Sequence, residues 1–259
     1  MQMCHIVPDT HLMLGVKNSG FLFLNRLDEF AATALMETNK PILVAPPEGH
    51  GPDMYEKYLR QAEEVHADQV ICPFVAGDVE KTWKTAQDFL EVYKRVGCKL
   101  KLMAIPQGTD WMTYDSCFMQ FISLQDQFSS YGLPAKLLDR AGQDFTGVQG
   151  TYPNRPWLIR RKIMRYIRMY MWEIYLLEIG SGGAQELSEC VGQFERVTRC
   201  VTAAAFGCAM KGRDLAKEGA QHPAPDLDFA LLTKASEDTV ALAYRNMQFL
   251  NDHARGIGA

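Results

Sequence analysis

Three polar side chains follow or interrupt apolar segments of the chain, where a parallel α/β protein would carry its chemistry. Gln107 comes directly after the apolar run 99–106, and Asp78 follows a similar run, 69–74, through a short polar loop. Glu178 interrupts the apolar stretch LLEIGSGG. The Gln amide donates two hydrogen bonds and accepts two, which suits the edge of a planar polar ligand. The spacing predicts a site assembled at strand ends.

Each candidate carboxylate also has a structural interpretation. Asp78 directly precedes a predicted helix, where its side chain can cap the first turn. Glu178 in an apolar strand needs an ion-pair partner, or it serves as a general acid with a raised pKa. Glu48 in PPEGHGPD is a third candidate, or an exposed loop acid. The neighbouring His50 has no second ligand at metal spacing, so we predict neither a metal nor a cofactor.

The apolar pattern predicts alternating strands and helices. The strand candidates are 11–16, 41–46, 69–74, 99–106, 145–149, 173–179 and 196–203, with a weak eighth at 3–7 or 20–24. The helical patterns are 25–38, 53–66, 79–96, 111–130, 183–194 and 235–254. This alternation predicts a parallel sheet with right-handed crossovers. The predicted class is α/β, with a (β/α)8 barrel as first choice and a doubly wound open sheet as second.

Length and composition bound the organisation of the chain. Its 259 residues are 47% hydrophobic and 22% charged, which predicts one barrel domain over 1–259. We expect an irregular insertion at 131–144 and a long connection at 212–234. The net charge of −4 does not indicate nucleic acid in bulk.

The seven cysteines are odd in number and include no CxxC pair. They predict reduced, mostly buried thiols. The sequence shows no signal peptide and no apolar run long enough for a bilayer. We therefore expect a cytoplasmic protein with no membrane partner.

One segment is strongly basic. Residues 155–168 carry six cations and no acid, interleaved with Trp157 and Tyr166. One interpretation is a face that contacts nucleic-acid phosphates. The other is the solvated face of a barrel helix whose long side chains cover apolar neighbours. The residues proposed for phosphate binding are Arg155, Arg160, Arg161 and Arg165.

The order of several motifs resembles the tRNA-guanine transglycosylase superfamily, and more closely its short branch of 7-deazaguanine DNA transglycosylase-like proteins. The resemblance covers about residues 40–212. The motifs that carry it are ADQV at 67–70, PQG at 106–108, GVQG at 147–150, the basic helix, IYLLEIGSGG at 174–183 and VTRCVTAAA at 197–205.

The resemblance implies a barrel that binds a guanine-like base at the carboxyl ends of its strands. In that family an Asp attacks the sugar C1′ and expels guanine, and a 7-deazaguanine base then enters. The resemblance assigns hydrogen bonding of the base to Gln107 and backbone contacts to Gly147 and Gly150. Phe74 occupies the position of the base-recognition Asp, and Val201 that of the nucleophile.

Because no acid occupies those two positions, Asp78 and Glu178 are the predicted catalytic residues. The first functional hypothesis is a nucleobase transglycosylase-like enzyme of DNA modification that exchanges a guanine or 7-deazaguanine base. Its expected partners are a guanine-like base or nucleotide, DNA, and either a second copy or a partner subunit. One alternative is a non-catalytic homologue that acts as a nucleic-acid-binding or partner subunit.

The other alternative is a small-molecule barrel enzyme of the phosphosugar type. Its phosphate would be held by the turn Ser181-Gly182-Gly183, which follows a predicted strand and precedes a helix. A Schiff-base mechanism is disfavoured because Lys101 lies in the amino half of its strand, away from the chemical end of a barrel.

Overall fold

The structure is a computed structural model that describes residues 1–24, 39–46, 51–134, 137, 158–170, 172–178, 183–218 and 235–257. Eight strands form one parallel sheet in the order β1-β8-β7-β6-β5-β4-β3-β2. The strands are β1 (Gln2–His5), β2 (Leu22–Leu24), β3 (Ile42–Val44), β4 (Gln69–Ile71), β5 (Lys101–Ala104), β6 (Ser130–Pro134), β7 (Glu173–Leu177) and β8 (Val197–Thr202). This is the strand order of a (β/α)8 barrel, so the predicted fold class is confirmed.

Helices separate the strands along the chain. They are α1 (Leu12–Asn18), α3 (Pro52–Glu64), α4 (Val79–Val96), α5 (Trp111–Ile122), α6 (Leu158–Ile167), α7 (Gly183–Gln193), α8 (Ala204–Met210), α9 (Leu215–Glu218) and α10 (Glu237–Arg255). Short 3-10 turns occur at η1 (Asp9–His11), η2 (Gln125–Gln127) and η3 (Arg168–Tyr170). The contacts divide the chain into two units, one of residues 22–145 and one of residues 1–21 with 146–259.

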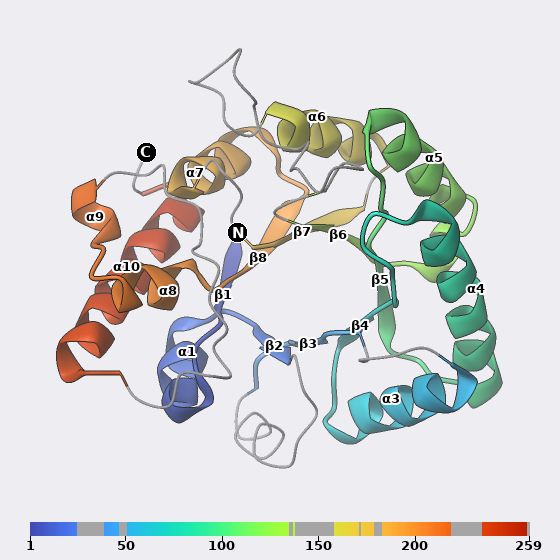
Figure 1. The fold of residues 1–259 in the computed structure, drawn as a ribbon, viewed down its shortest axis with the longest axis horizontal. Coiled ribbons are helices and arrows are strands. Elements are labelled where there is room, and N and C mark those ends of the chain that lie inside the picture. The colour runs from blue at the N-terminus through green and yellow to red at the C-terminus, as the bar shows by residue number, and fades with distance from the viewer. Residues whose placement is uncertain are drawn as a thin grey trace. The chain divides into compact units, whose positions relative to one another are not determined.

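The unit of residues 22–145 contains β2 to β6, and α3, α4 and α5 follow β3, β4 and β5 (Figure 1). Its strands pair in a regular parallel register, with Val44 opposite Val70 and Val70 opposite Leu102. These three side chains are almost fully buried, as expected for a parallel sheet covered by helices. The register brings the carboxyl ends of these strands to the same edge of the sheet.

The other unit contains β1, β7 and β8 with α1 and α6 to α10. Met3 pairs with Cys200, and Cys200 pairs with Leu176, so the three strands are aligned at their centres. Helix α10 packs against α8, α7 and β1 (Figure 1). The carboxyl ends of β1, β7 and β8 therefore lie together in this unit.

The predicted strand at 11–16 is wrong, because these residues form η1 and most of α1. A short apolar run cannot be assigned to a helix or a strand from periodicity alone. Gly15 explains the outcome: a Cβ there would lie 2.8 Å from the carbonyl oxygen of His5, so only glycine lets α1 pack this closely on β1. The two weak strand candidates, 3–7 and 20–24, overlap β1 and β2.

The predicted insertion at 131–144 begins with a strand. Residues 131–134 belong to β6, although Gly132 and Pro134 are typical of a turn. Burial of Tyr131 and Leu133 in the sheet outweighs those local signals. The predicted strand 145–149 and helix 25–38 lie outside the described residues, as does most of the predicted connection at 212–234, which begins with α9.

All seven cysteines are free and buried, as predicted. Among the described residues, no helix has the length and hydropathy needed to cross a bilayer. The cytoplasmic location and the single-domain organisation stay predictions.

Candidate functional site

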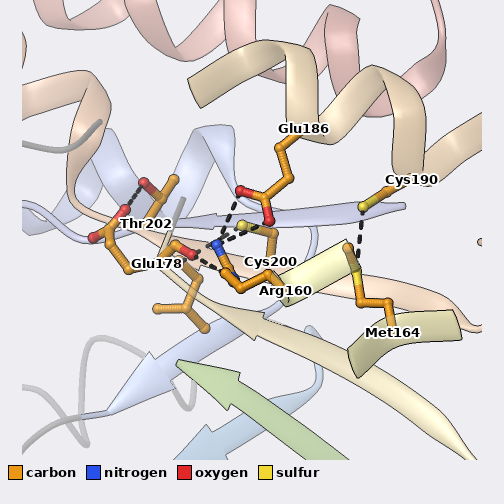
Figure 2. Close-up of polar contacts among 8 residues, drawn as sticks. Arg160, Met164, Glu178, Glu186, Cys190, Cys200 and Thr202 are labelled. Carbon is orange, nitrogen blue, oxygen red and sulfur yellow. Dashed lines mark hydrogen bonds and ion pairs between the residues drawn. The ribbon is translucent and has the colours of Figure 1, made fainter. Parts of the chain in front are cut away.

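Glu178 lies directly after β7, at the carboxyl end of the strand. It is half-buried, and its backbone has a φ of 79°, in the left-handed region that residues with a side chain rarely adopt. Such strained positions cluster at functional sites. The chain turns sharply here and directs the carboxylate toward β8 (Figure 2).

Two groups at the end of β8 hold the Glu178 carboxylate. The Thr202 hydroxyl donates a hydrogen bond to Oε1, and the Ala203 backbone N–H donates to Oε2 over 2.7 Å. The same Thr202 Oγ1 accepts from the Ala204 backbone N–H at 3.0 Å. The carboxylate is thus fixed by two donors from the neighbouring strand end (Figure 2).

A buried ion pair supports the end of β7. The Arg160 guanidinium from α6 donates to Oε2 of Glu186 on α7 at 2.9 Å, and the same Nη1 lies 2.9 Å from Oε1 as an ion-pair contact. Its Nη2 also donates to the backbone carbonyl of Glu178 at 3.3 Å. The side chains of Arg160 and Glu186 are 1% and 0% exposed. Arg160 therefore links α6, α7 and the strand end that carries Glu178 (Figure 2).

The predicted phosphate-contacting face needs correction. Arg160 is buried and cannot contact a phosphate at the surface. Arg161 is partly exposed, and its Nη2 pairs with Glu189 and Gln193 at 2.9 Å each. Arg165 is exposed, and Arg155 lies outside the described residues. Although the segment is basic throughout, the cations of α6 lie in different surroundings: Arg160 is buried, Arg161 is partly exposed and Arg165 is exposed.

The thiols near this network are not nucleophiles. Burial is the largest cause that raises the pKa of Cys200, and the nearby Glu178 and Glu186 carboxylates add to it. Burial also raises the pKa of Cys190, whose Sγ lies 3.8 Å from Met164 Sδ (Figure 2). Both groups stay protonated at neutral pH and pack as small apolar side chains.

Gln107 lies in the unit of residues 22–145 and is 3% exposed. Its Oε1 accepts from the Gly77 backbone N–H at 3.2 Å, and its Nε2 donates to the Ile105 carbonyl at 3.4 Å. The amide therefore ties the loop after β4 to the end of β5. Phe74 is half-buried after β4. The roles of Gln107 and Phe74 in binding a base stay predictions.

Asp78 has the structural role that was one of its two interpretations, which is to cap the helix that follows it. It is the N-cap of α4, and its Oδ1 accepts from the Lys81 backbone N–H at 2.9 Å. The same N–H is the largest cause that lowers the pKa of Asp78, and the Lys81 side chain adds to the effect. Asp78 and Glu178, the two predicted catalytic acids, belong to different units. Glu48, His50, Gly147, Gly150, Ser181 and Gly182 lie outside the described residues.

His5 is a titratable residue that the sequence analysis missed. It ends β1, is 3% exposed, and its Nε2 lies 3.1 Å from Asn251 Oδ1. Burial lowers the pKa of His5 from 6.5 to about 4, against the opposing effect of the Asn251 hydrogen bond. The available signal was a His within the apolar start MCHIV.

We expect His5 to make the protein less stable in mild acid. The unfolded chain binds a proton on His5 as pH falls through 6.5, whereas the folded chain does so only near 4. The free energy of unfolding should fall by about 2 kcal/mol between pH 7 and pH 5 through this residue. Urea unfolding at both pH values measures the difference.

The matched comparison uses two histidine variants. His5→Gln should remove this part of the pH dependence, whereas replacing the exposed His66 by Gln should retain it. An unchanged pH dependence in His5→Gln would contradict the assignment.

Within the described ranges, no three His, Cys, Asp or Glu side chains are grouped so that they could hold a metal ion. The arrangement at the ends of β7 and β8 is instead a fixed carboxylate at the carboxyl edge of a parallel sheet. A carboxylate held in this way can accept or donate a proton.

The chain matches no protein-family model and no curated protein. A solved structure that it resembles is 2,3-dimethylmalate lyase, described as a member of the PEP mutase/isocitrate lyase superfamily. The identity is 12% and the TM-score 0.47, with 69% of this chain and 58% of the lyase chain covered. The chain thus spans less than two thirds of the length of that protein.

These comparisons overturn the predicted family. The motif order predicted membership of the tRNA-guanine transglycosylase superfamily, but no family model matches, and one solved structure that the chain resembles is described as a lyase. The hypothesis of a DNA-modifying base-exchange enzyme has no support in these comparisons and is not retained. Several of these motifs cover strands and helices that a (β/α)8 barrel has whatever it binds, such as β8 at 197–202 and α6 at 158–167.

Proposed function

We propose that this protein is a small-molecule enzyme in which the Glu178 carboxylate transfers a proton at the carboxyl ends of β7 and β8. The observation that carries the proposal is the fixed geometry of this side chain. Its backbone has a φ of 79°, and its two oxygens accept from Thr202 and Ala203. Barrel enzymes place their reacting groups at this edge of the sheet.

The surroundings of Glu178 favour a catalytic carboxylate over an ordinary helix cap. Glu178 accepts from the backbone N–H of Ala203, the residue before α8, and holds this position from a strained backbone, which a purely structural contact would not need. Arg160 donates to the Glu178 carbonyl and is anchored by the buried Glu186, so the strained turn has rigid support. A reacting group held on rigid elements is positioned for proton transfer without further ordering.

The substrate class that we propose is a phosphorylated sugar-like molecule. Helix α7 begins at Gly183, five residues after Glu178, and a helix N-terminus attracts anions. Lys101 is exposed at the first residue of β5, the amino end of the strand. These features favour proton transfer by Glu178 over a Schiff base with Lys101.

The test compares two glutamates on one strand. Glu178→Gln keeps the shape of the side chain but removes its ability to take a proton. Glu173→Gln makes the same change at the exposed amino end of β7. Purified variants are incubated with glyceraldehyde 3-phosphate, ribulose 5-phosphate and glucose 6-phosphate, and turnover is followed by NMR.

We expect wild type and Glu173→Gln to convert one of these substrates. Glu178→Gln should lose at least about 100-fold in kcat/KM, the usual size of a general acid–base contribution. Equal activity of Glu178→Gln and wild type would contradict the proposal, and so would the absence of turnover with all three compounds.

A further inference from the structure

A pocket lies at the amino end of β1, within the unit of residues 1–21 and 146–259. Its volume is about 280 Å³, and its lining residues come from the start of β1 and from the last turns of α1 and α10. Its lining includes the polar and charged side chains of Gln2, Lys17, Asn18, Gln248, Asn251 and Arg255. The carboxyl-end site with Glu178 does not include any of them.

The charges on the pocket wall have one sign. Lys17 and Arg255 contribute cations, and the lining contains no Asp or Glu. The described residues give Lys17 no ion pair, and Arg255 has a long contact of 4.0 Å with Asp252, outside the lining. In a protein of net charge −4, a wall with two cations and no acid is a local positive field.

The amides leave hydrogen-bonding capacity in the pocket. Arg199 Nε donates to Gln2 Oε1 at 3.2 Å, and its guanidinium lies over the Phe21 and Tyr175 rings, 5.3 and 5.1 Å from their centroids. Because the Gln2 oxygen is thus occupied, its Nε2 is the group left to donate. Gln248 Nε2 donates to Asn18 Oδ1 at 2.9 Å.

The ends of α1 and α10 do not oppose an anion as strongly as helix C-termini usually do. Their last carbonyls would present negative partial charge. The carbonyls of Leu14, Gly15 and Asn18 already accept from the side chains of Asn18, Ser19 and Asn251. At the end of α10, the carbonyls of Asp252 and His253 accept from the backbone of the following turn. The cations therefore dominate the field.

We infer that this pocket binds a small anionic metabolite through its phosphate or carboxylate group. Lys17 and Arg255 supply the charge, and Gln2 supplies a directed donor. A volume of about 280 Å³ admits a small metabolite and is below the range of drug-sized sites. Since the pocket lies at the end of the barrel that serves stability, a ligand there would act as a stabilising or regulatory effector.

The test measures the melting temperature of the full chain in inorganic phosphate, glycerol 3-phosphate or citrate, each against sodium chloride of equal ionic strength. The variants are Lys17→Gln, Arg255→Gln and their combination. Lys211→Gln, which replaces an exposed lysine outside the lining, is the matched control. Circular dichroism confirms that each variant folds, as expected for exposed side chains.

We expect at least one of the three anions to raise the melting temperature of wild type and Lys211→Gln by several degrees. Each single variant should lose at least half of the shift, and the double variant all of it. A response to both phosphates identifies a phosphoryl ligand, and a response to citrate alone a carboxylate. No response in wild type, or the same response in the double variant, would overturn the inference.

Discussion

Replacing Arg160 by Met is expected to lower the free energy of unfolding by about 3–5 kcal/mol, which is a large part of the stability of an ordinary domain. The reason is the Glu186 carboxylate, which is 0% exposed and pairs with Arg160 at 2.9 Å. Without the guanidinium, a charge would remain buried without compensation. Urea denaturation followed by circular dichroism measures the loss.

Two controls separate this effect from general damage to α6. The double variant Arg160→Met/Glu186→Met removes both charges and should recover most of the loss, since an apolar pair can replace a buried ion pair. Arg161→Met breaks the partly exposed pair with Glu189 one residue along and should cost less than about 1 kcal/mol. Similar losses in Arg160→Met and Arg161→Met would contradict the account.

Gly108→Ala is expected to be the most damaging small substitution in the unit of residues 22–145. A Cβ at Gly108 would lie 2.4 Å from the backbone nitrogen of Tyr114 and 2.5 Å from its Cα. Backbone atoms in the first turn of α5 cannot rotate away as a flexible side chain could. We expect a loss of about 3 kcal/mol or more, measured by thermal or urea unfolding.

The matched control is Gly192→Ala. Gly192 lies in α7, and a Cβ there would meet nothing within 4 Å. Because alanine has a higher helix propensity than glycine, this change should leave the free energy of unfolding unchanged or raise it by up to about 1 kcal/mol. Equal stability of Gly108→Ala and wild type would show that α5 can shift away from the strand end.

The elements that the sequence predicted well have both a long periodic pattern and clear end signals. Helix α4 runs over 79–96 as expected, because Asp78 caps its start and Gly97 ends it with a φ of 70°. The segment 11–16 has only a few apolar residues, and tertiary packing decided its conformation. In β6, burial outweighed the turn signals of Gly132 and Pro134.

The site was only partly predictable. Glu178 was identified because a charged side chain in an apolar strand is costly unless it is paired or functional. The sequence did not reveal that the Thr202 hydroxyl and the Ala203 backbone N–H donate to the Glu178 carboxylate. The pair between Arg160 and Glu186 joins residues 26 positions apart, which no local pattern reveals. From the sequence alone, the buried Arg160 cannot be distinguished from the exposed cations of the same basic segment.

The resemblance to transglycosylases failed for a physical reason. Several of its motifs cover elements that any barrel must have, such as VTRCVTAAA at β8, the basic helix at α6 and the turn PQG after β5. Gly108 shows this directly, since it is needed for the close approach of α5 whatever the ligand. Gln107 likewise has a structural role that fixes the loop at Gly77. Residues with such roles indicate a fold more strongly than a reaction.

The most direct measurement for the central claim is solvent deuterium incorporation, followed by NMR, into ribulose 5-phosphate and glyceraldehyde 3-phosphate. If Glu178 removes a proton from substrate carbon, wild type and Glu173→Gln in D2O should place deuterium in one of these compounds at a catalysed rate. Glu178→Gln should reduce that rate to the uncatalysed level. Incorporation by Glu178→Gln at the wild-type rate would contradict the account.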